Sequence, residues 1–322
     1  MYGKYGEGFQ NGQYPLVMSI RYDTDGHIAV ITIANARRAN SLDKQHALDL
    51  GDAWRNAWDD RNVRAIIVTG EGDKHFCGGH DLSIRDDVTP EEHAFLALER
   101  IFRPPSGYIN GFQTGIDGGM ADHFPRIHKP VIAAVNGWAV GAGLYLLLAS
   151  TDIRIAAIGN ANFRFGLISR GWVGAGPGAT MLMKQLRYVD AMKMLLADET
   201  IDAEEAVRIG LVNEAVSAEQ LMPRALELAK RIVEMPPLAT IKMKEFIHRF
   251  SELPIEQAWN VQAMMNFLLL QTTQDAQEGR TSFLERRDPD YTGEYAGLEG
   301  FYENLTDDER ARLDELKRQI DW

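Results

Sequence analysis

An alternation of apolar strands with an amphipathic helix is the feature that most constrains the fold of this chain. Residues Ile28–Ala34 (IAVITIA) are rich in β-branched side chains, and Arg64–Thr69 (RAIIVT) is a continuous apolar run that ends at Gly70. Between them, the apolar residues of Asp43–Trp58 recur at helical spacing, and Asp43 suits the N-cap position. A strand, a helix and a strand in this order form a βαβ unit, which predicts a partly parallel sheet buried on both faces.

The alternation continues and then gives way to helices. Val131–Val135 and Ile153–Ala157 predict two further strands, with an apolar helix after Gly143 between them. From Asp190 onward we expect no further strands, because the remaining apolar residues follow helical spacing. The helices predicted there are Ala203–Ile209, Ala218–Glu234, Pro237–Arg249, Ile255–Thr273 and the charged segment Asp307–Ile320.

These patterns divide the chain into three parts. We predict an α/β core at residues 1–200, a helical region at 201–287 and a tail at 288–322 that contains the terminal helix. The core includes an enlarged, glycine-containing segment at about residues 83–126. A connection of that length usually covers a functional site or is mobile.

Composition excludes several classes of partner. The formal net charge of −12 argues against a general nucleic-acid-binding protein, which needs a basic face to neutralise phosphates. A single cysteine, Cys77, rules out an intrachain disulfide and favours a reducing compartment. Residues 1–15 lack the apolar segment of a secretory signal, and no apolar run is long enough to span a bilayer. We therefore expect a cytoplasmic protein with no nucleic acid or membrane partner.

Two glycine-rich segments follow predicted strands and would expose backbone N–H groups. The first, Phe76–Leu82 (FCGGHDL), contains a Gly-Gly pair that allows a sharp turn. The second, Asn136–Leu146 (NGWAVGAGLYL), places Gly141, Ala142 and Gly143 at the start of a helix, where N–H groups have no intrahelical partner. A Gly-Gly turn alone is most often only a turn. Together, the two segments predict a site that stabilises negative charge on an oxygen atom.

These and other segments resemble the crotonase (enoyl-CoA hydratase/isomerase) superfamily. The matching segments are Asn35–Leu42 (NARRANSL), Phe76–Leu82, Lys129–Gly143 (KPVIAAVNGWAVGAG), Asp152–Ala156 (DIRIA), Ile201–Val212 and Glu278–Arg287, in the family's order. The resemblance implies an α/β fold of the ClpP/crotonase type, a spiral of ββα units with a helical C-terminal region. It also implies assembly into a homotrimer or homohexamer.

The resemblance further implies an acyl-CoA substrate and roles for individual residues. The backbone N–H groups of His80 and Ala142 would form an oxyanion hole for the thioester carbonyl oxygen. Coenzyme A would enter as part of the substrate, so no separate cofactor is expected, and the scattered histidines suggest no metal. The residues expected to contact substrate or CoA are Arg37, Arg38, Ala39, Lys74, Gly79, Asp81, Gly141, Leu167 and Arg170, with Phe283 and Arg287 reaching CoA from a neighbouring subunit.

The chain departs from the family's hydratases at both catalytic glutamates. Those enzymes use two glutamates to place and activate a water molecule, and the corresponding positions here are Tyr145 and Leu167. No Asp or Glu occurs in Asn162–Gly178, so a shift of one residue in the alignment does not restore the second carboxylate. We predict an enzyme of the hydratase/isomerase class that uses the oxyanion hole with a different set of proton-transfer groups.

The identity of those groups stays open at this level. Tyr145 could donate a proton or only fill space, and the imidazole of His80 could titrate or shape the pocket. Arg170, next to Ser169, could hold a substrate carboxylate. Further candidates in the enlarged segment are Asp117, Asp122 and His123. The alternative functions are a C–C bond hydrolase of the β-diketone type, an acyl-CoA decarboxylase, or a non-catalytic acyl-CoA-binding protein.

Overall fold

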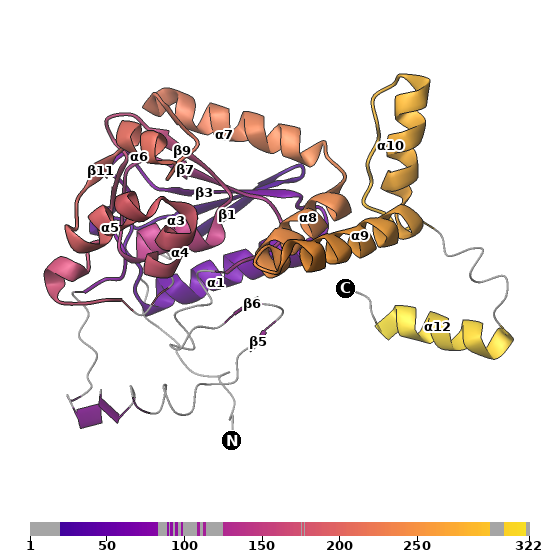
Figure 1. Cartoon of the computed structure of the whole chain (residues 1–322), viewed down its shortest axis with the longest axis horizontal. Coiled ribbons are helices and arrows are strands. Elements are labelled where there is room, and N and C mark those ends of the chain that lie inside the picture. Colours follow the sequence, from indigo (N-terminus) through magenta and orange to yellow (C-terminus); the bar gives the residue numbers. More distant parts are fainter. Residues whose placement is uncertain are drawn as a thin grey trace, which may run out of the picture.

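A computed structural model gives the fold of the chain. It describes residues 20–82, 125–174, 178–296 and 306–319, together with Gly176 and a few short pieces between residues 89 and 113. Candidates Asp117, Asp122 and His123 lie outside the described residues. The described chain forms a layered α/β body from which a C-terminal helical arm projects (Figure 1).

Two sheets build the body. The larger has the order β1-β2-β3-β7-β9-β12 and is parallel from β2 to β12, with an antiparallel β1–β2 hairpin at one edge. Its strands are β1 Ile20–Asp25, β2 Ile28–Ile33, β3 Ala65–Gly70, β7 Val131–Val135, β9 Ile153–Ala157 and β12 Glu214–Val216. The smaller has the order β11-β10-β8-β4, formed by β11 Ile201–Asp202, β10 Asn162–Arg164, β8 Trp138–Val140 and β4 His75–Cys77. A separate pair joins β5 Tyr108–Ile109 to β6 Phe112–Gln113.

Successive units of the chain contribute one strand to each sheet. The first strand of each pair (β3, β7 and β9) joins the larger sheet, and the second (β4, β8 and β10) joins the smaller.

The described helices are α1 Lys44–Asp59, α3 Ala142–Ser150, α4 Gly178–Gln185, α5 Tyr188–Leu196, α6 Ala203–Ile209, α7 Ala218–Val233, α8 Pro237–Phe250, α9 Ile255–Thr272, α10 Gln274–Glu285 and α12 Asp307–Gln319, with short 3-10 turns η1 Ala36–Arg38 and η2 Ile168–Arg170. Asp43 caps α1 as predicted, since its carboxylate accepts a hydrogen bond from the His46 N–H at 2.8 Å. None of the helices in the described part combines the length and apolar character needed to cross a bilayer.

The larger sheet is covered on both faces, as its continuous apolar strands predict. All residues of β3 are buried. On one face, Trp54 of α1 and Leu144 of α3 pack into a core with Phe76 and Phe163. On the other face, α7 runs across the sheet (Figure 1) and buries Leu221, Ala225 and Ala229, whose spacing places them on one side of the helix.

The expectation of no strands beyond Asp190 is wrong. β11 pairs with β10, and β12 extends the larger sheet beside β9. Both are too short for a period-two pattern to show. Asn213 joins β12 to the sheet, because its N–H donates to the Arg154 carbonyl at 2.9 Å and its side chain accepts from the Arg154 N–H at 2.8 Å.

The C-terminal arm consists of α9, α10 and the segment that follows α10. That segment, residues 286–296, returns along α10, and its Ala296 N–H donates to the Thr272 carbonyl at 2.8 Å. Arg64, just before β3, ties the segment to the body: its guanidinium donates to the carbonyls of Tyr291 at 2.9 Å, Val233 at 3.3 Å and Thr292 at 3.4 Å.

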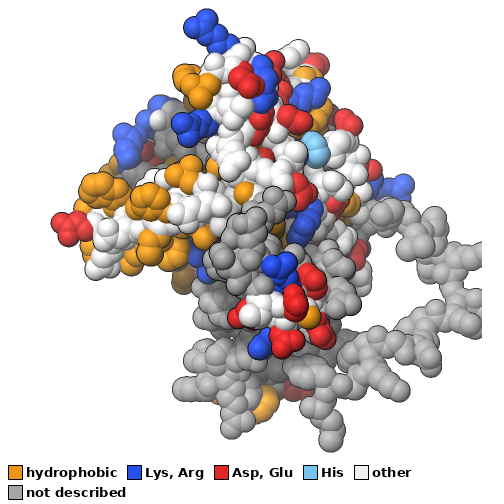
Figure 2. Space-filling view, turned by 90° about the vertical axis from the view of Figure 1, so that its right-hand side faces the viewer, with side chains coloured by type: hydrophobic (Ala, Val, Ile, Leu, Met, Phe, Trp, Pro, Cys, Tyr) orange, Lys and Arg blue, Asp and Glu red, His pale blue; other side chains and the backbone are white. Residues whose placement is uncertain are grey.

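The arm exposes apolar side chains. No residue of α9 is buried, and hydrophobic side chains gather to one side in the view of Figure 2. The exposed apolar residues of α9 and α10 are Ile255, Trp259, Met264, Phe267, Leu268, Leu270, Phe283 and Leu284.

Candidate active site

The two glycine-rich turns meet at the carboxyl ends of neighbouring parallel strands. β4 pairs with β8, and the turns Gly78–His80 and Gly141–Ala142 follow them. Gly79 has a φ of +93°, and a methyl group built on it would lie 2.8 Å from the Val140 carbonyl oxygen and 3.2 Å from the Ala142 nitrogen. Only glycine combines this backbone conformation with so close an approach. The two turns are therefore in direct contact.

The N–H group of Ala142 lies at the first position of α3. The helical hydrogen bonds begin one turn later, where the Tyr145 N–H donates to the Gly141 carbonyl at 3.0 Å. The Ala142 N–H consequently has no partner within the helix, and the positive end of the helix dipole lies beside it. The Gly141 N–H differs from our expectation, because it donates to the Arg164 carbonyl at 3.2 Å.

The N–H group of His80 is directed by a parallel bridge to Leu42. The Leu42 N–H donates to the Gly79 carbonyl at 2.8 Å, and the Asp81 N–H donates to the Leu42 carbonyl at 2.9 Å. Successive N–H groups of an extended chain point to opposite sides, so the His80 N–H points away from Leu42 and toward the side of β8.

Buried residues fix the segments next to the two turns. The Asn136 side chain accepts from the Gly70 N–H at 3.0 Å and donates to the Gly72 carbonyl at 2.8 Å, which fixes the turn before β8. A methyl group at Gly143 would lie 2.1 Å from the Cys77 carbonyl oxygen, so the start of α3 packs directly on the end of β4. Complete burial raises the pKa of the Cys77 thiol to about 12, which makes it a packing residue and not a nucleophile.

The segment that carries Arg37, Arg38 and Ala39 lies against the first turn. The Gly78 N–H donates to the Ala39 carbonyl at 2.8 Å. Asn40 anchors the segment, because its buried side chain donates to the His75 carbonyl at 2.6 Å.

The charged residues around this segment are partly paired. Arg37 is exposed, whereas Arg38 forms an ion pair of 2.7 Å with Asp81, whose side chain is nearly buried. Lys74 is also exposed, but it precedes β4 and lies at the opposite end of that strand from His80.

Tyr145 and Leu167 come together, as the two glutamate positions of a hydratase would. A methyl group at Gly174 would lie 2.2 Å from the Tyr145 hydroxyl oxygen and 2.5 Å from Leu167 Cδ1. The Tyr145 ring is buried under the chain at Gly174, Gly176 and Gly178, where any side chain would overlap it. Burial raises the pKa of Tyr145 to about 12, so the phenol is protonated at neutral pH.

Comparison with known proteins identifies the family. The model of the family described as enoyl-CoA hydratase/isomerase matches residues 23–99 and 112–294. The chain belongs to the enoyl-CoA hydratase/isomerase family. It is 34% identical over 278 residues to a carnitinyl-CoA dehydratase of Citrobacter koseri, covering 85% of this chain and 98% of that protein. A carnitinyl-CoA dehydratase of Escherichia coli is 33% identical over the same length and with the same coverage.

Solved structures agree with this assignment. An enoyl-CoA hydratase from Bacillus anthracis superposes with a TM-score of 0.74 at 27% identity, covering 86% of this chain and all of that one. An enoyl-CoA hydratase from Mycobacterium tuberculosis gives a TM-score of 0.69 at 28% identity, covering 85% of this chain and 99% of that one. The predicted crotonase superfamily and α/β fold are confirmed, and the chain is an enzyme of the hydratase/isomerase family.

A buried carboxylate that the sequence did not predict, that of Asp198, lies beside Leu167, which stands at the second glutamate position of the family's hydratases. Asp198 accepts hydrogen bonds from the Ser169 hydroxyl at 2.5 Å, the Gly166 N–H at 2.6 Å and the Arg164 guanidinium at 2.9 Å. Burial acts to raise the pKa of Asp198, but the hydrogen bonds from Ser169, Gly166 and Arg164 outweigh it and hold the pKa below its usual value. Asp198 has a φ of +50°, and nothing in the sequence relates it to the η2 turn.

Arg170 lies near the turn formed by Gly141 and Ala142. Its guanidinium donates to the Gly166 carbonyl. A methyl group at Gly166 would lie 3.7 Å from Arg170 Nη1 and 3.8 Å from the Gly141 nitrogen, so these two nitrogens are less than 8 Å apart.

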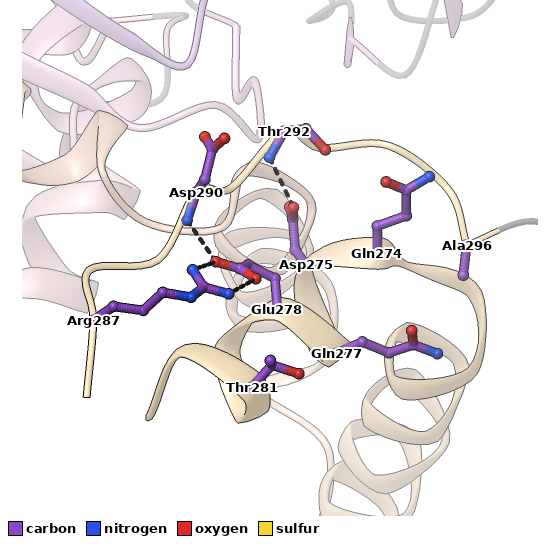
Figure 3. A pocket seen from close by; sticks show the side chains of 9 residues that line it. All are labelled: Gln274, Asp275, Gln277, Glu278, Thr281, Arg287, Asp290, Thr292 and Ala296. Carbon is purple, nitrogen blue, oxygen red and sulfur yellow. Dashed lines mark hydrogen bonds and ion pairs between the residues drawn. The ribbon is translucent and has the colours of Figure 1, made fainter. Parts of the chain in front are cut away.

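The two C-terminal residues do not join the site within one chain. Phe283 is 82% exposed on α10, which projects away from α3 (Figure 1). Arg287 is engaged by Glu278, with Nη2 to Oε2 at 2.7 Å, and this hydrogen bonding lowers the pKa of Glu278 to about 2. Arg287 lines a polar pocket of about 770 Å³ between α10 and residues 290–296 (Figure 3).

The described site residues thus fall into two groups. The residues gathered around the two turns are Arg37, Arg38, Ala39, Gly79, His80, Asp81, Gly141, Ala142, Tyr145, Leu167 and Arg170. The residues placed elsewhere are Lys74, Phe283 and Arg287. Within the part of the chain that the structure describes, no three His, Cys, Asp or Glu side chains gather as a metal site would require.

Proposed function

We propose that this chain activates an acyl-CoA thioester by holding its carbonyl oxygen between the N–H groups of His80 and Ala142. The observation that carries the proposal is the contact between the two turns. Gly79 packs so closely on the second turn that a methyl group in place of its hydrogen would lie 3.2 Å from the Ala142 nitrogen. Donors fixed by the backbone need no rearrangement when negative charge develops on the oxygen. Removing one such donor typically costs about 2.7–4 kcal/mol of transition-state stabilisation.

The CoA part of the substrate is proposed to bind along Arg37, Arg38 and Ala39. This segment leads directly to the first turn through the Gly78–Ala39 hydrogen bond. The chain has a net charge of −12, so local positive charge would help to attract an anionic ligand to this edge; exposed Arg37 supplies it, while Arg38 is paired with Asp81. Coenzyme A serves as part of the substrate, and no separate cofactor is invoked.

The reaction is proposed to proceed through an enolate or tetrahedral anion without a pair of catalytic carboxylates. Tyr145 and Leu167 occupy the two positions at which the family's hydratases carry glutamates. Neither side chain can act as a base at neutral pH. A neutral phenol can donate a proton, and the Tyr145 side chain leans toward the start of α3, where Ala142 lies. The names of the carnitinyl-CoA dehydratase relatives make elimination of water from a 3-hydroxyacyl thioester one reaction to assay.

A second candidate, decarboxylation of a 2-carboxyacyl-CoA, is favoured by the same pair of residues. In this reaction the bond between Cα and the carboxylate breaks, CO2 leaves, and the electron pair becomes the enolate held by the two N–H groups. No base is needed, and a proton then adds to Cα. The phenol of Tyr145 beside the apolar Leu167 matches a reaction that requires a proton donor and no carboxylate.

An Ala142→Pro variant tests the oxyanion hole. Proline removes the N–H yet suits the first position of a helix, so the fold should persist. We expect turnover to fall about 10²-fold or more on whichever enoyl-, carnitinyl-, malonyl-type or β-ketoacyl-CoA thioester the wild type converts. The matched control is Ala218→Pro, the same change at the exposed first position of α7.

Three results would contradict the proposal. Full activity in a folded Ala142→Pro variant would remove Ala142 from the oxyanion hole. Turnover of a CoA-free β-diketone, with no conversion of any thioester, would show that the enzyme is a C–C bond hydrolase and does not act on acyl-CoA. Binding of thioesters without any turnover would leave only an acyl-CoA-binding protein.

Assembly into a trimer or hexamer is proposed on the apolar surface of the arm. Trp259, Phe267 and Phe283 are each more than 60% exposed, which is costly for a helix surrounded by water. In such an assembly Phe283 and Arg287 would approach the site of a neighbouring copy. Light scattering coupled to size-exclusion chromatography should give a mass of three or six chains, and a monomer would contradict this arrangement.

A further inference from the structure

Arg170 carries a positive charge that no described carboxylate neutralises. One of its N–H groups donates to the Gly166 carbonyl, and its remaining donors have no partner among the residues that the structure describes. It lies on η2, less than 8 Å from the Gly141 nitrogen of the oxyanion turn. A thioester carbonyl held by Ala142 would therefore lie within the length of a short acyl chain of this guanidinium.

The neighbouring charges are already paired with each other. The Asp198 carboxylate, whose side chain is only 4% exposed, forms an ion pair of 2.9 Å with Arg164. It also accepts from Ser169 and Gly166, and among the described residues no ion pair or hydrogen bond joins it to Arg170. Arg164, Arg170 and Asp198 together leave one net positive charge at the rim of the site.

Arg170 is exposed to solvent, but the backbone turn that carries it is anchored. Asp198 holds both Gly166 and Ser169, so the short η2 turn is anchored on each side of Leu167. Ile168, Trp172 and Val173 present exposed apolar side chains along the same stretch. Because Arg170 is exposed, water and salt would partly screen an ion pair formed there, and a moderate gain in affinity is expected.

We propose that the acyl group of the substrate carries a carboxylate and that Arg170 binds it. The proposal rests on the acyl-CoA function and specifies its substrate class, a short dicarboxylic acyl thioester. The short separation of Arg170 Nη1 from the oxyanion turn limits the acyl chain to a few carbons. An acyl chain with a quaternary ammonium group, such as the carnitinyl group in the names of the relatives, would meet the same charge with repulsion.

Binding of matched thioesters tests the proposal. Succinyl-CoA and butyryl-CoA differ chiefly by a carboxylate in place of a terminal methyl group, and 4-trimethylammoniobutyryl-CoA supplies the opposite charge. Dissociation constants would be measured by calorimetry for the wild type, Arg170→Gln and Arg170→Lys. We expect succinyl-CoA to bind the wild type about 10-fold more tightly than butyryl-CoA, as for a partly exposed charge-assisted hydrogen bond.

The variants should separate the charge from the rest of the site. Arg170→Gln should abolish the preference for succinyl-CoA and leave butyryl-CoA binding unchanged, whereas Arg170→Lys should keep part of the preference. The control Arg55→Gln removes a guanidinium from α1, where Arg55 pairs with Asp52, and should change none of the three affinities.

The outcomes distinguish this proposal from the function on which it rests. Equal binding of succinyl-CoA and butyryl-CoA, or a preference for the trimethylammonium thioester, would overturn the carboxylate-binding role while the acyl-CoA function stands. Failure of all three thioesters and of free CoA to bind would overturn the function itself.

Discussion

The contact between Tyr145 and Gly178 allows a test of the site that needs no substrate. A methyl group at Gly178 would lie 1.9 Å from Tyr145 Cε1 and 2.1 Å from Cδ1, well inside van der Waals contact. Gly178 is buried at the start of α4 and has an ordinary φ, so Gly178→Ala introduces steric overlap without backbone strain. We expect this change to lower the free energy of unfolding by about 2 kcal/mol, as overpacking typically does.

Removing the ring should eliminate this effect. Tyr145→Ala alone should cost about 3–5 kcal/mol, because it leaves a cavity under three glycines. In that background the methyl group introduced by Gly178→Ala occupies vacated space, so the second substitution should cost nothing more. Tyr145→Phe should not rescue Gly178→Ala, because the overlapping atoms are ring carbons and not the hydroxyl oxygen.

Urea unfolding of the four proteins in the Tyr145–Gly178 cycle measures the coupling. The control is Gly279→Ala in α10, where the added methyl group would lie 3.1 Å from the Tyr291 hydroxyl and should be accommodated. A coupling free energy of at least about 1 kcal/mol is expected for residues in such contact. Additive effects, within about 0.5 kcal/mol, would show that the ring does not lie under Gly178 and would refute the arrangement described for the site.

Two further predictions concern groups outside the reaction. Burial lowers the pKa of His128 to about 4 and that of His248 to about 3, so both stay neutral in the fold while the unfolded chain takes up protons near pH 6.5. The free energy of unfolding should therefore fall as pH drops from 6.5 toward 4, and urea midpoints should show a shallower fall in His248→Asn; an unchanged slope would contradict this. Cys77 should resist alkylation in the native protein and react only after urea unfolding, because its thiol is buried with a pKa of about 12; rapid native labelling, followed by mass spectrometry, would disprove that placement.

The meeting of the two glycine-rich turns could be predicted from the sequence. Gly-Gly after one strand and Gly-Ala-Gly before a helix are local patterns, and β4 and β8 are neighbours in a parallel sheet, so their carboxyl ends meet. The strands Val131–Val135 and Ile153–Ala157 and the helix Ala203–Ile209 also have the predicted bounds, because each has a clear period or a continuous apolar run.

The side chains that support the two turns could not be predicted in the same way. Asp198 lies far along the chain from Ser169, and only the fold brings its carboxylate to that turn. Asn40 and Asn136 similarly act through hydrogen bonds to carbonyl groups of other segments, which leave no periodic pattern. The short strands β11 and β12 depend on pairing with β10 and β9, so their own sequences did not reveal them.

Because Arg64 binds the C-terminal arm near its base, a small rotation there would move the end of the arm by a larger distance. Its guanidinium joins the end of α7 to the chain that returns along α10, through the carbonyls of Val233 and Tyr291. α10 has 12 residues and is therefore roughly 18 Å long, so a rotation of about 10° at its base would displace its tip by about 3 Å. Phe283 lies near that tip, and a displacement of this size equals the difference between contact with a neighbouring molecule and separation from it. The position of Phe283 thus depends on hydrogen bonds from Arg64, a residue that lies more than 200 positions earlier in the sequence, just before β3.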